Sequence, residues 1–130
     1  MVEMKNPIKE ARAHPEIRHL SLWRTKLAYA CMGDQLRTGI QDDMHYHEND
    51  DHIFMVLEGE CTVRTAHKEF VLKQHDTVML ESKQPYRLCT TGKERSLLLG
   101  LGSAGVNGVP RSRVPDVASH TPVHEPLVAS

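Results

Sequence analysis

After residue 19 the hydrophobic positions gather into short runs, and residues that favour turns separate each run from the next. Strands are expected at residues 20–23, 27–32, 36–40, 53–57, 61–65, 69–72, 77–80, 86–90 and 96–101. The turns between them are expected at Gly33-Asp34, Asn49-Asp50, Glu58-Gly59, His75-Asp76 and Thr91-Gly92. Many short strands at intervals of roughly 8–12 residues favour an all-β sandwich or barrel over an alternating α/β fold.

The two ends of the chain depart from this pattern. Residues 7–14 predict a short helix that Asn6 and Pro7 start and that Pro15 stops. From Ser103 onward the chain has prolines and no apolar periodicity, so it cannot bury enough surface to fold alone. The predicted organisation is an N-terminal helix and arm at 1–18, a β domain at 19–102, and a flexible or dimer-embracing tail at 103–130.

Composition narrows the class of ligand. A hydrophobic fraction of 39% in 130 residues is enough for one domain with a core. Sixteen basic and seventeen acidic residues argue against a nucleic-acid binder held by phosphate contacts. Three widely spaced cysteines fit neither a disulfide framework nor a thiolate zinc motif, and no apolar run is long enough for a signal peptide or a membrane span. The sequence predicts a soluble cytoplasmic protein with a small-molecule substrate, and no nucleic-acid or membrane partner.

Three histidines precede the run at 53–57. His45 and His47 are one residue apart, so on an extended strand their rings project from the same face. A short turn at residues 49–50 would bring His52 beside them, across a β-hairpin. Alternation along the next strand places His52 on the same inward face as Phe54. The segment predicts a metal site.

These residues resemble the first motif of the cupin superfamily: a glycine, five residues, His-x-His, three or four residues, a glutamate, six residues and a glycine. The residues at the family's spacing are Gly39, His45, His47 and Gly59. His52 stands at the glutamate position. The likeness covers roughly residues 20–101, and it implies a double-stranded β-helix, or jelly-roll barrel, and a homodimer.

A second cupin motif is altered further. It usually reads Gly-Asp, a short apolar strand, then Pro-x-Gly-x-x-His. Here His75 and Lys83 stand at the two glycines, whereas Asp76 and Pro85 look typical. Tyr86 stands where the family places its fourth metal ligand.

The predicted metal ligands are therefore His45, His47 and His52. Three neutral imidazoles would leave a divalent ion with its full charge, which favours a substrate that arrives as an enolate or carboxylate. Such a site suits iron(II), zinc, nickel or copper and is poor for magnesium or calcium. Three protein ligands leave positions open, as in catalytic sites.

Within the cupins, a three-histidine site is similar to that of iron-dependent dioxygenases that cleave β-diketones. The resemblance implies an Fe(II) dioxygenase acting on a small anionic or enolisable molecule, with Tyr86 as an acid or a hydrogen-bond donor to the substrate. Some cupin lyases use a tyrosine near the metal as a base, so an oxygen-independent lyase or isomerase with zinc or nickel is the alternative. A non-catalytic cupin that binds a metal or a ligand is a further alternative.

The remaining assignments rest on residue type. Arg64 and Arg87 are predicted to bind substrate together with Phe54, because a guanidinium matches a carboxylate; the structural alternative for each arginine is an outward-facing strand position. Five acids near the histidines are expected to form an exposed face that attracts cations and keeps the imidazoles basic. These acids are Asp42, Asp43, Glu48, Asp50 and Asp51.

Overall fold

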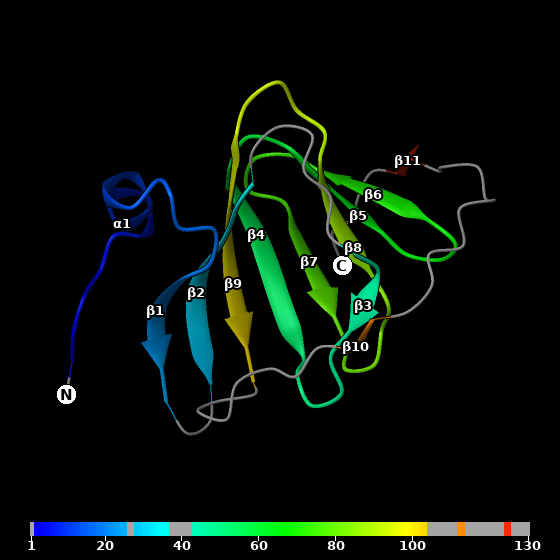
Figure 1. The fold of residues 1–130 in the computed structure, drawn as a ribbon, viewed down its shortest axis with the longest axis horizontal. Helices are drawn as coiled ribbons and strands as arrows, with labels where there is room; N and C mark the ends of the chain where they lie inside the picture. The colour runs from blue at the N-terminus through cyan, green and yellow to red at the C-terminus, as the bar shows by residue number, and fades with distance from the viewer. Residues whose placement is uncertain (1, 26–27, 37–42, 104–111, 114–123, 126–130) are drawn as a thin grey trace.

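Two sheets, antiparallel except where β11 joins β6, face each other in the computed structural model (Figure 1). The structure describes residues 2–25, 28–36, 43–103, 112–113 and 124–125. The elements are α1 (Pro7–Ala13), β1 (Leu20–Arg24), β2 (Tyr29–Leu36), β3 (His45–Tyr46), β4 (His52–Glu58), β5 (Cys61–Arg64), β6 (Glu69–Leu72), β7 (Thr77–Leu80), β8 (Arg87–Thr90), β9 (Ser96–Gly102), β10 (Ser112–Arg113) and β11 (His124–Glu125). The all-β prediction is confirmed, and most strands fall within two residues of their expected bounds.

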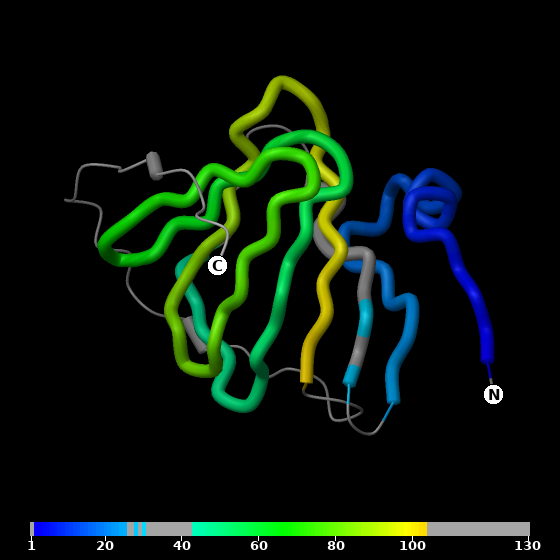
Figure 2. Tube along the Cα trace, turned by 180° about the vertical axis from the view of Figure 1, so that it is seen from behind, coloured from blue at the N-terminus to red at the C-terminus, as the bar shows by residue number. Residues whose placement is uncertain are grey.

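One sheet has the strand order β1-β2-β9-β4-β7 and the other β11-β6-β5-β8, while β10 and β3 form a separate pair. Figure 2 shows the two sheets from behind. Their inner faces enclose one apolar core, because alternate side chains of each strand point inward. The core residues are Phe54, Val56, Cys61, Val63, Leu72, Leu80, Tyr86, Leu88 and Leu98.

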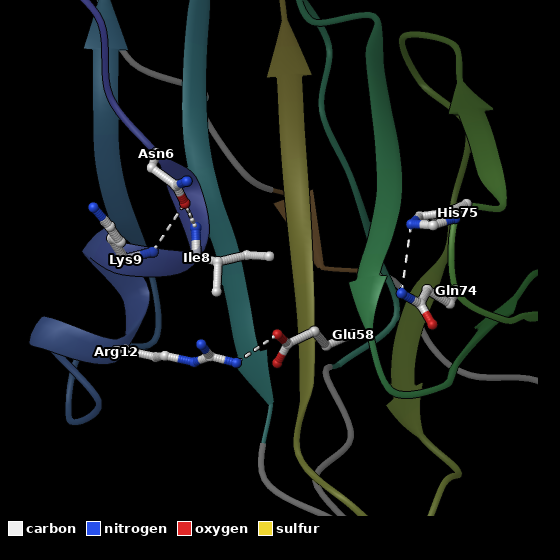
Figure 3. A network of polar contacts seen from close by, with 7 residues as sticks. All are labelled: Asn6, Ile8, Lys9, Arg12, Glu58, Gln74 and His75. Atoms are coloured by element: carbon white, nitrogen blue, oxygen red, sulfur yellow. Dashed lines mark hydrogen bonds and ion pairs between the residues drawn. The ribbon is translucent and has the colours of Figure 1, made fainter.

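The predicted helix is confirmed. The Asn6 side-chain oxygen accepts from the backbone N–H groups of Ile8 and Lys9, at 3.1 Å each, so it caps the first turn (Figure 3). Arg12 on the same helix forms a 3.0 Å ion pair with Glu58 at the end of β4. The helix packs against the sheet through Ala11, Leu22 and Leu97. None of the predicted metal ligands lies in this contact.

Strand β4 has the predicted alternation. His52, Phe54 and Val56 are buried on its inner face. On the outer face Ile53 pairs in register with Met79 of β7 and Leu101 of β9, and these three side chains are 42%, 53% and 46% exposed. Because the period of a strand is two, this register fixes His52 as an interior residue.

Two expected turns are wrong. The first is Gly33-Asp34, which lies inside β2; this strand continues to Leu36 with a register shift against β9. Pairing with β9 at Gly33 and Leu36 outweighs the local preference of these two residues for a turn. Of the strand expected at 36–40, only Leu36 is described.

The second is the β-hairpin across the histidines. Strand β3 pairs with β10, and β4 pairs with β7 and β9, so His47 to Asp51 connect different sheets. His45 instead forms an antiparallel bridge with Tyr86, far along the chain. The three histidines therefore meet across the barrel rather than across one hairpin.

Two short strands of the C-terminal segment pair with the barrel: β10 is antiparallel to β3, and β11 is parallel to β6. Within the part of the chain that the structure describes, no helix is long and apolar enough to cross a membrane.

Candidate metal centre

The three predicted ligands lie together at the end of the barrel where β4 begins. The ring centroids of His45 and His47 are 5.1 Å apart, and those of His47 and His52 are 5.3 Å apart. His45 and His52 are buried, and His47 is half-buried. The spacing in the sequence thus brings three imidazoles around a common space.

Tyr86, the residue before β8, closes this space. The N–H of His45 donates to the Tyr86 carbonyl at 2.9 Å, and the N–H of Tyr86 donates to the His45 carbonyl at 2.8 Å. Residues that exchange both hydrogen bonds in an antiparallel pair carry their side chains on the same face. Accordingly, the Tyr86 ring lies 4.4 Å from that of His45 and 5.4 Å from that of His52.

The turn between β7 and β8 holds the histidine segment in place. The N–H of Lys83 donates to the His47 carbonyl at 2.7 Å, and the N–H of Ser82 donates to Asp51 Oδ1 at 2.7 Å. Because these bonds join the turn to both ends of the connection from β3 to β4, His47 is positioned by residues that come about 35 positions later in the chain.

The orientation of two rings is set by bonds at Nδ1. His45 Nδ1 donates to the Asp43 carbonyl at 2.6 Å, and His52 Nδ1 donates to Asp50 Oδ2 at 2.7 Å. Metal-bound histidines usually donate their other ring nitrogen to a carbonyl or carboxylate in this way. In both rings the nitrogen that would coordinate a metal is therefore Nε2.

His52 Nε2 is buried and has no hydrogen-bond partner among the described residues. Burial lowers the pKa of His52 below its ordinary value, while the hydrogen bond and the charge of Asp50 oppose that shift. The imidazole is thus neutral near pH 7, which is the form that binds metals.

The donor set fits a transition metal. Imidazole nitrogens suit iron(II), zinc, nickel and copper, and an orphaned buried nitrogen is a position where an ion would supply the missing partner. Within the described ranges, however, no three His, Cys, Asp or Glu side chains have the arrangement of a formed metal site. The metal centre therefore stays a prediction.

The predicted substrate residues divide into two groups. The Phe54 ring is 4.9 Å from that of His52 and 6.4 Å from that of Tyr86, so Phe54 lines the same space. Arg64 and Arg87 face each other across β5 and β8, on the side of the sheet opposite to the core-facing residues. Arg64 Nε also lies 3.7 Å from a carboxylate oxygen of Glu69. The structure therefore does not bring the two arginines to the histidines.

Asp50 is the residue whose role sequence reasoning missed. The five acids were expected to be exposed, and Asp43, Glu48 and Asp51 are, but Asp50 is 1% exposed; Asp42 lies outside the described residues. The oxygens of Asp50 accept from His52 Nδ1 and from the backbone N–H of Ser103 at 2.9 Å. A carboxylate two residues before an inward-facing strand histidine was the available signal.

The altered second motif keeps the backbone shape that its glycines would provide. His75 and Lys83, which stand at the two glycine positions, have φ values of +72° and +68°. Non-glycine residues seldom adopt this left-handed conformation. The backbone thus supports the alignment without gaps that places Tyr86 at the fourth-ligand position.

Comparison with known proteins agrees with this fold. The sequence profile of the cupin domain matches residues 35–101. A protein with a double-stranded β-helix domain from Klebsiella pneumoniae superimposes with a TM-score of 0.72 at 14% identity, covering 88% of this chain and all of the other. KdgF from Halomonas sp. has a TM-score of 0.64 at 20% identity, with 72% of this chain and 83% of the other covered. The DMSP lyase DddQ from Ruegeria pomeroyi has a TM-score of 0.59 at 18% identity, with 73% and 47% covered.

The fold and the histidine motif together define a double-stranded β-helix protein. The chain belongs to the cupin family, since the family profile covers more than half of it. No curated protein matches the chain, and the structural similarities lie at identities that establish the fold alone.

Proposed function

We propose that this cupin is a metal-dependent enzyme that acts on a small anionic or enolisable molecule, with His45, His47 and His52 as the metal ligands. The observation that carries the proposal is the buried Nε2 of His52, which has no partner among the described residues although Nδ1 of the same ring is held by Asp50. Iron(II) is the first metal to test, and dioxygenase chemistry is the first reaction.

The residues of the site have separable tasks. A bound divalent ion would supply Lewis-acid polarisation of an enolate or carboxylate and, as iron(II), reactivity toward dioxygen. The Asp43 carbonyl and the Asp50 carboxylate orient two of the imidazoles through Nδ1. Phe54 provides an apolar wall that excludes water, and the Tyr86 hydroxyl can hold or donate a proton near the substrate.

Elemental analysis of untagged protein tests the metal. The parent protein should contain iron or another first-row metal at about one ion per chain, and the His52→Ala variant should lose most of it. His75→Ala is the matched control, because this histidine is exposed in the turn before β7. A parent protein that takes up no metal even after incubation with iron(II), zinc or nickel would remove the basis of the proposal.

Oxygen uptake tests the reaction. Iron-loaded protein should consume dioxygen when a β-diketone is added, and His52→Ala should not. A non-catalytic binding cupin would retain metal but convert no substrate.

A second candidate is an oxygen-independent lyase or isomerase with zinc or nickel. It is favoured by the position of Tyr86, a buried phenol 4.4 Å from His45 between ring centroids, where it could serve as a base. The similar fold of the DMSP lyase DddQ gives a first substrate class to assay. Under this candidate Tyr86→Phe lowers turnover by about 100-fold or more with the metal content unchanged.

The homodimer expected from the family remains part of the proposal. Sedimentation velocity should give a mass of twice the 14.7 kDa chain. A species of one chain mass at micromolar concentration would contradict it.

A further inference from the structure

We infer that Asp50 is the positioning residue of this centre: its buried carboxylate fixes His52 with Nε2 available to the metal and supplies the negative charge that the three imidazoles lack. The inference rests on the proposed function, because it takes His52 as a metal ligand. It assigns a role to a residue that lies outside the ligand set.

Hydrogen bonds to two described residues hold the carboxylate. Oδ2 accepts from His52 Nδ1 at 2.7 Å, and Oδ1 accepts from the Ser103 N–H at 2.9 Å. His52 begins β4 and pairs with Gly102 at the end of β9, so Asp50 joins the first residue of one central strand to the end of its neighbour. Both oxygens thus have donors at the ends of paired strands or directly after them, and the imidazole cannot rotate without breaking a bond.

Burial gives this arrangement an electrostatic consequence. The side chains of Asp50 and His52 are 0% and 4% exposed. A buried carboxylate carries a desolvation cost of several kcal/mol unless it is paired. A cation bound at Nε2 would lie across the ring from that carboxylate and offset the cost, while the carboxylate would raise the basicity of the imidazole. The metal would then not keep its full positive charge, contrary to what three neutral ligands alone imply.

The neighbouring acid provides a contrast. Asp51 is exposed, and its Oδ1 accepts from the Ser82 N–H at 2.7 Å, so its carboxylate holds a loop rather than an imidazole. Asp50→Asn and Asp51→Asn are therefore matched variants: each removes one charge from the same segment and keeps the side-chain volume. Only the first replaces an acceptor of His52 Nδ1.

The test is a cobalt(II) titration of metal-free parent protein, Asp50→Asn, Asp51→Asn and His52→Ala, followed by calorimetry and by visible absorption. Asp50→Asn should bind cobalt(II) about 10–100-fold more weakly than the parent, with a shifted d–d spectrum. Asp51→Asn should stay within about threefold of the parent, because its charge is screened by solvent. His52→Ala should lose the tight site.

The outcomes separate this inference from the proposed function. Failure of the parent protein to bind cobalt(II), zinc(II) or iron(II) would defeat both. Tight binding by the parent and loss in His52→Ala, with Asp50→Asn equal to Asp51→Asn in affinity and spectrum, would overturn the role of Asp50 alone.

A measurement on the parent protein covers the case in which Asp50→Asn does not fold. In the ¹⁵N spectrum of labelled imidazoles, zinc(II) should shift Nε2 of His52 while Nδ1 stays protonated. Coordination through Nδ1 instead would contradict the inference. Asp50→Glu, which retains the charge but displaces it, should recover part of the affinity that Asp50→Asn loses.

Discussion

The two motif segments of this cupin have diverged in opposite ways. The first, residues 45–59, keeps the family's spacing but differs at one motif position, since His52 stands where the motif has a glutamate. The second, residues 75–86, keeps the left-handed backbone conformation but lacks the glycines that adopt it without strain. His75 and Lys83 hold positive φ angles where the motif has glycines. In the first segment the chemistry changed while the geometry held. In the second the geometry was retained at a cost in backbone strain.

The difference shows which constraint acts on each segment. At position 52 the side chain is what differs: the carboxylate of the motif is absent there, and a buried carboxylate, that of Asp50, lies two residues earlier. Around Lys83 the backbone decides, because its N–H must reach the His47 carbonyl whatever side chain it carries. Under the proposed function the first segment would supply the donor atoms, and the second holds the backbone of His47 in position.

Restoring the family's glutamate gives the largest expected effect. In chelator-treated His52→Glu, Asp50 loses its imidazole donor and meets a second buried carboxylate, so the free energy of unfolding should fall by about 4 kcal/mol. Urea denaturation followed by circular dichroism measures this loss.

The double variant His52→Glu/Asp50→Asn is the internal control. The amide that it introduces at position 50 can donate to the new carboxylate while the amide oxygen accepts from the Ser103 N–H, so much of the lost stability should return. If the single variant is as stable as the parent, Asp50 and His52 do not form a coupled buried pair.

Gly59 closes the first motif, and its replacement should have an intermediate effect. Its φ is +82°, and an added Cβ would lie 2.8 Å from the Arg95 carbonyl oxygen and 2.9 Å from the Ser96 Cα. Gly59→Ala should therefore lower the free energy of unfolding by about 2–3 kcal/mol, through left-handed strain and overpacking together. Denaturant titration of the metal-free protein checks the value.

Gly92→Ala is the matched control for this substitution. A Cβ at Gly92 would meet the Glu60 side chain at 3.1 Å, a contact that a small shift relieves, so the effect should be smaller. Equal losses in the two variants would mean that the backbone conformation of Gly59 is not what makes it necessary.

Local sequence patterns predicted much of this structure, because alternation of apolar and polar residues marks a strand and its inner face, and a capping residue marks the start of a helix. The alternation of His52, Phe54 and Val56 identified the inner face of β4 before any pairing was known. The capping by Asn6 set the start of α1 in the same way. Spacing also brought the three histidines together, since two of them share one face and the third lies inward on the next strand.

Long-range contacts account for what local patterns missed. The bridge between His45 and Tyr86 replaces the expected hairpin, and no local signal reports a pairing of residues so far apart. Asp50 is buried where Ser103, the residue after β9, donates its N–H to the Asp50 carboxylate. An aspartate beside a turn is usually exposed. The continuity of β2 through Gly33 likewise depends on pairing with β9.

The smallest expected effect tests the strain in the second motif. His75→Gly and Lys83→Gly should each raise the free energy of unfolding by about 0.5–1 kcal/mol, because relief of left-handed strain exceeds the added entropy of the unfolded chain. His67→Gly is the control: this exposed histidine lacks a positive φ, so glycine there should lower stability by a similar amount. Parallel denaturation curves decide the sign. If all three variants lose stability alike, the chain has accommodated His75 and Lys83 without strain, and the contrast between the two motifs reduces to the single residue His52 in place of the motif's glutamate.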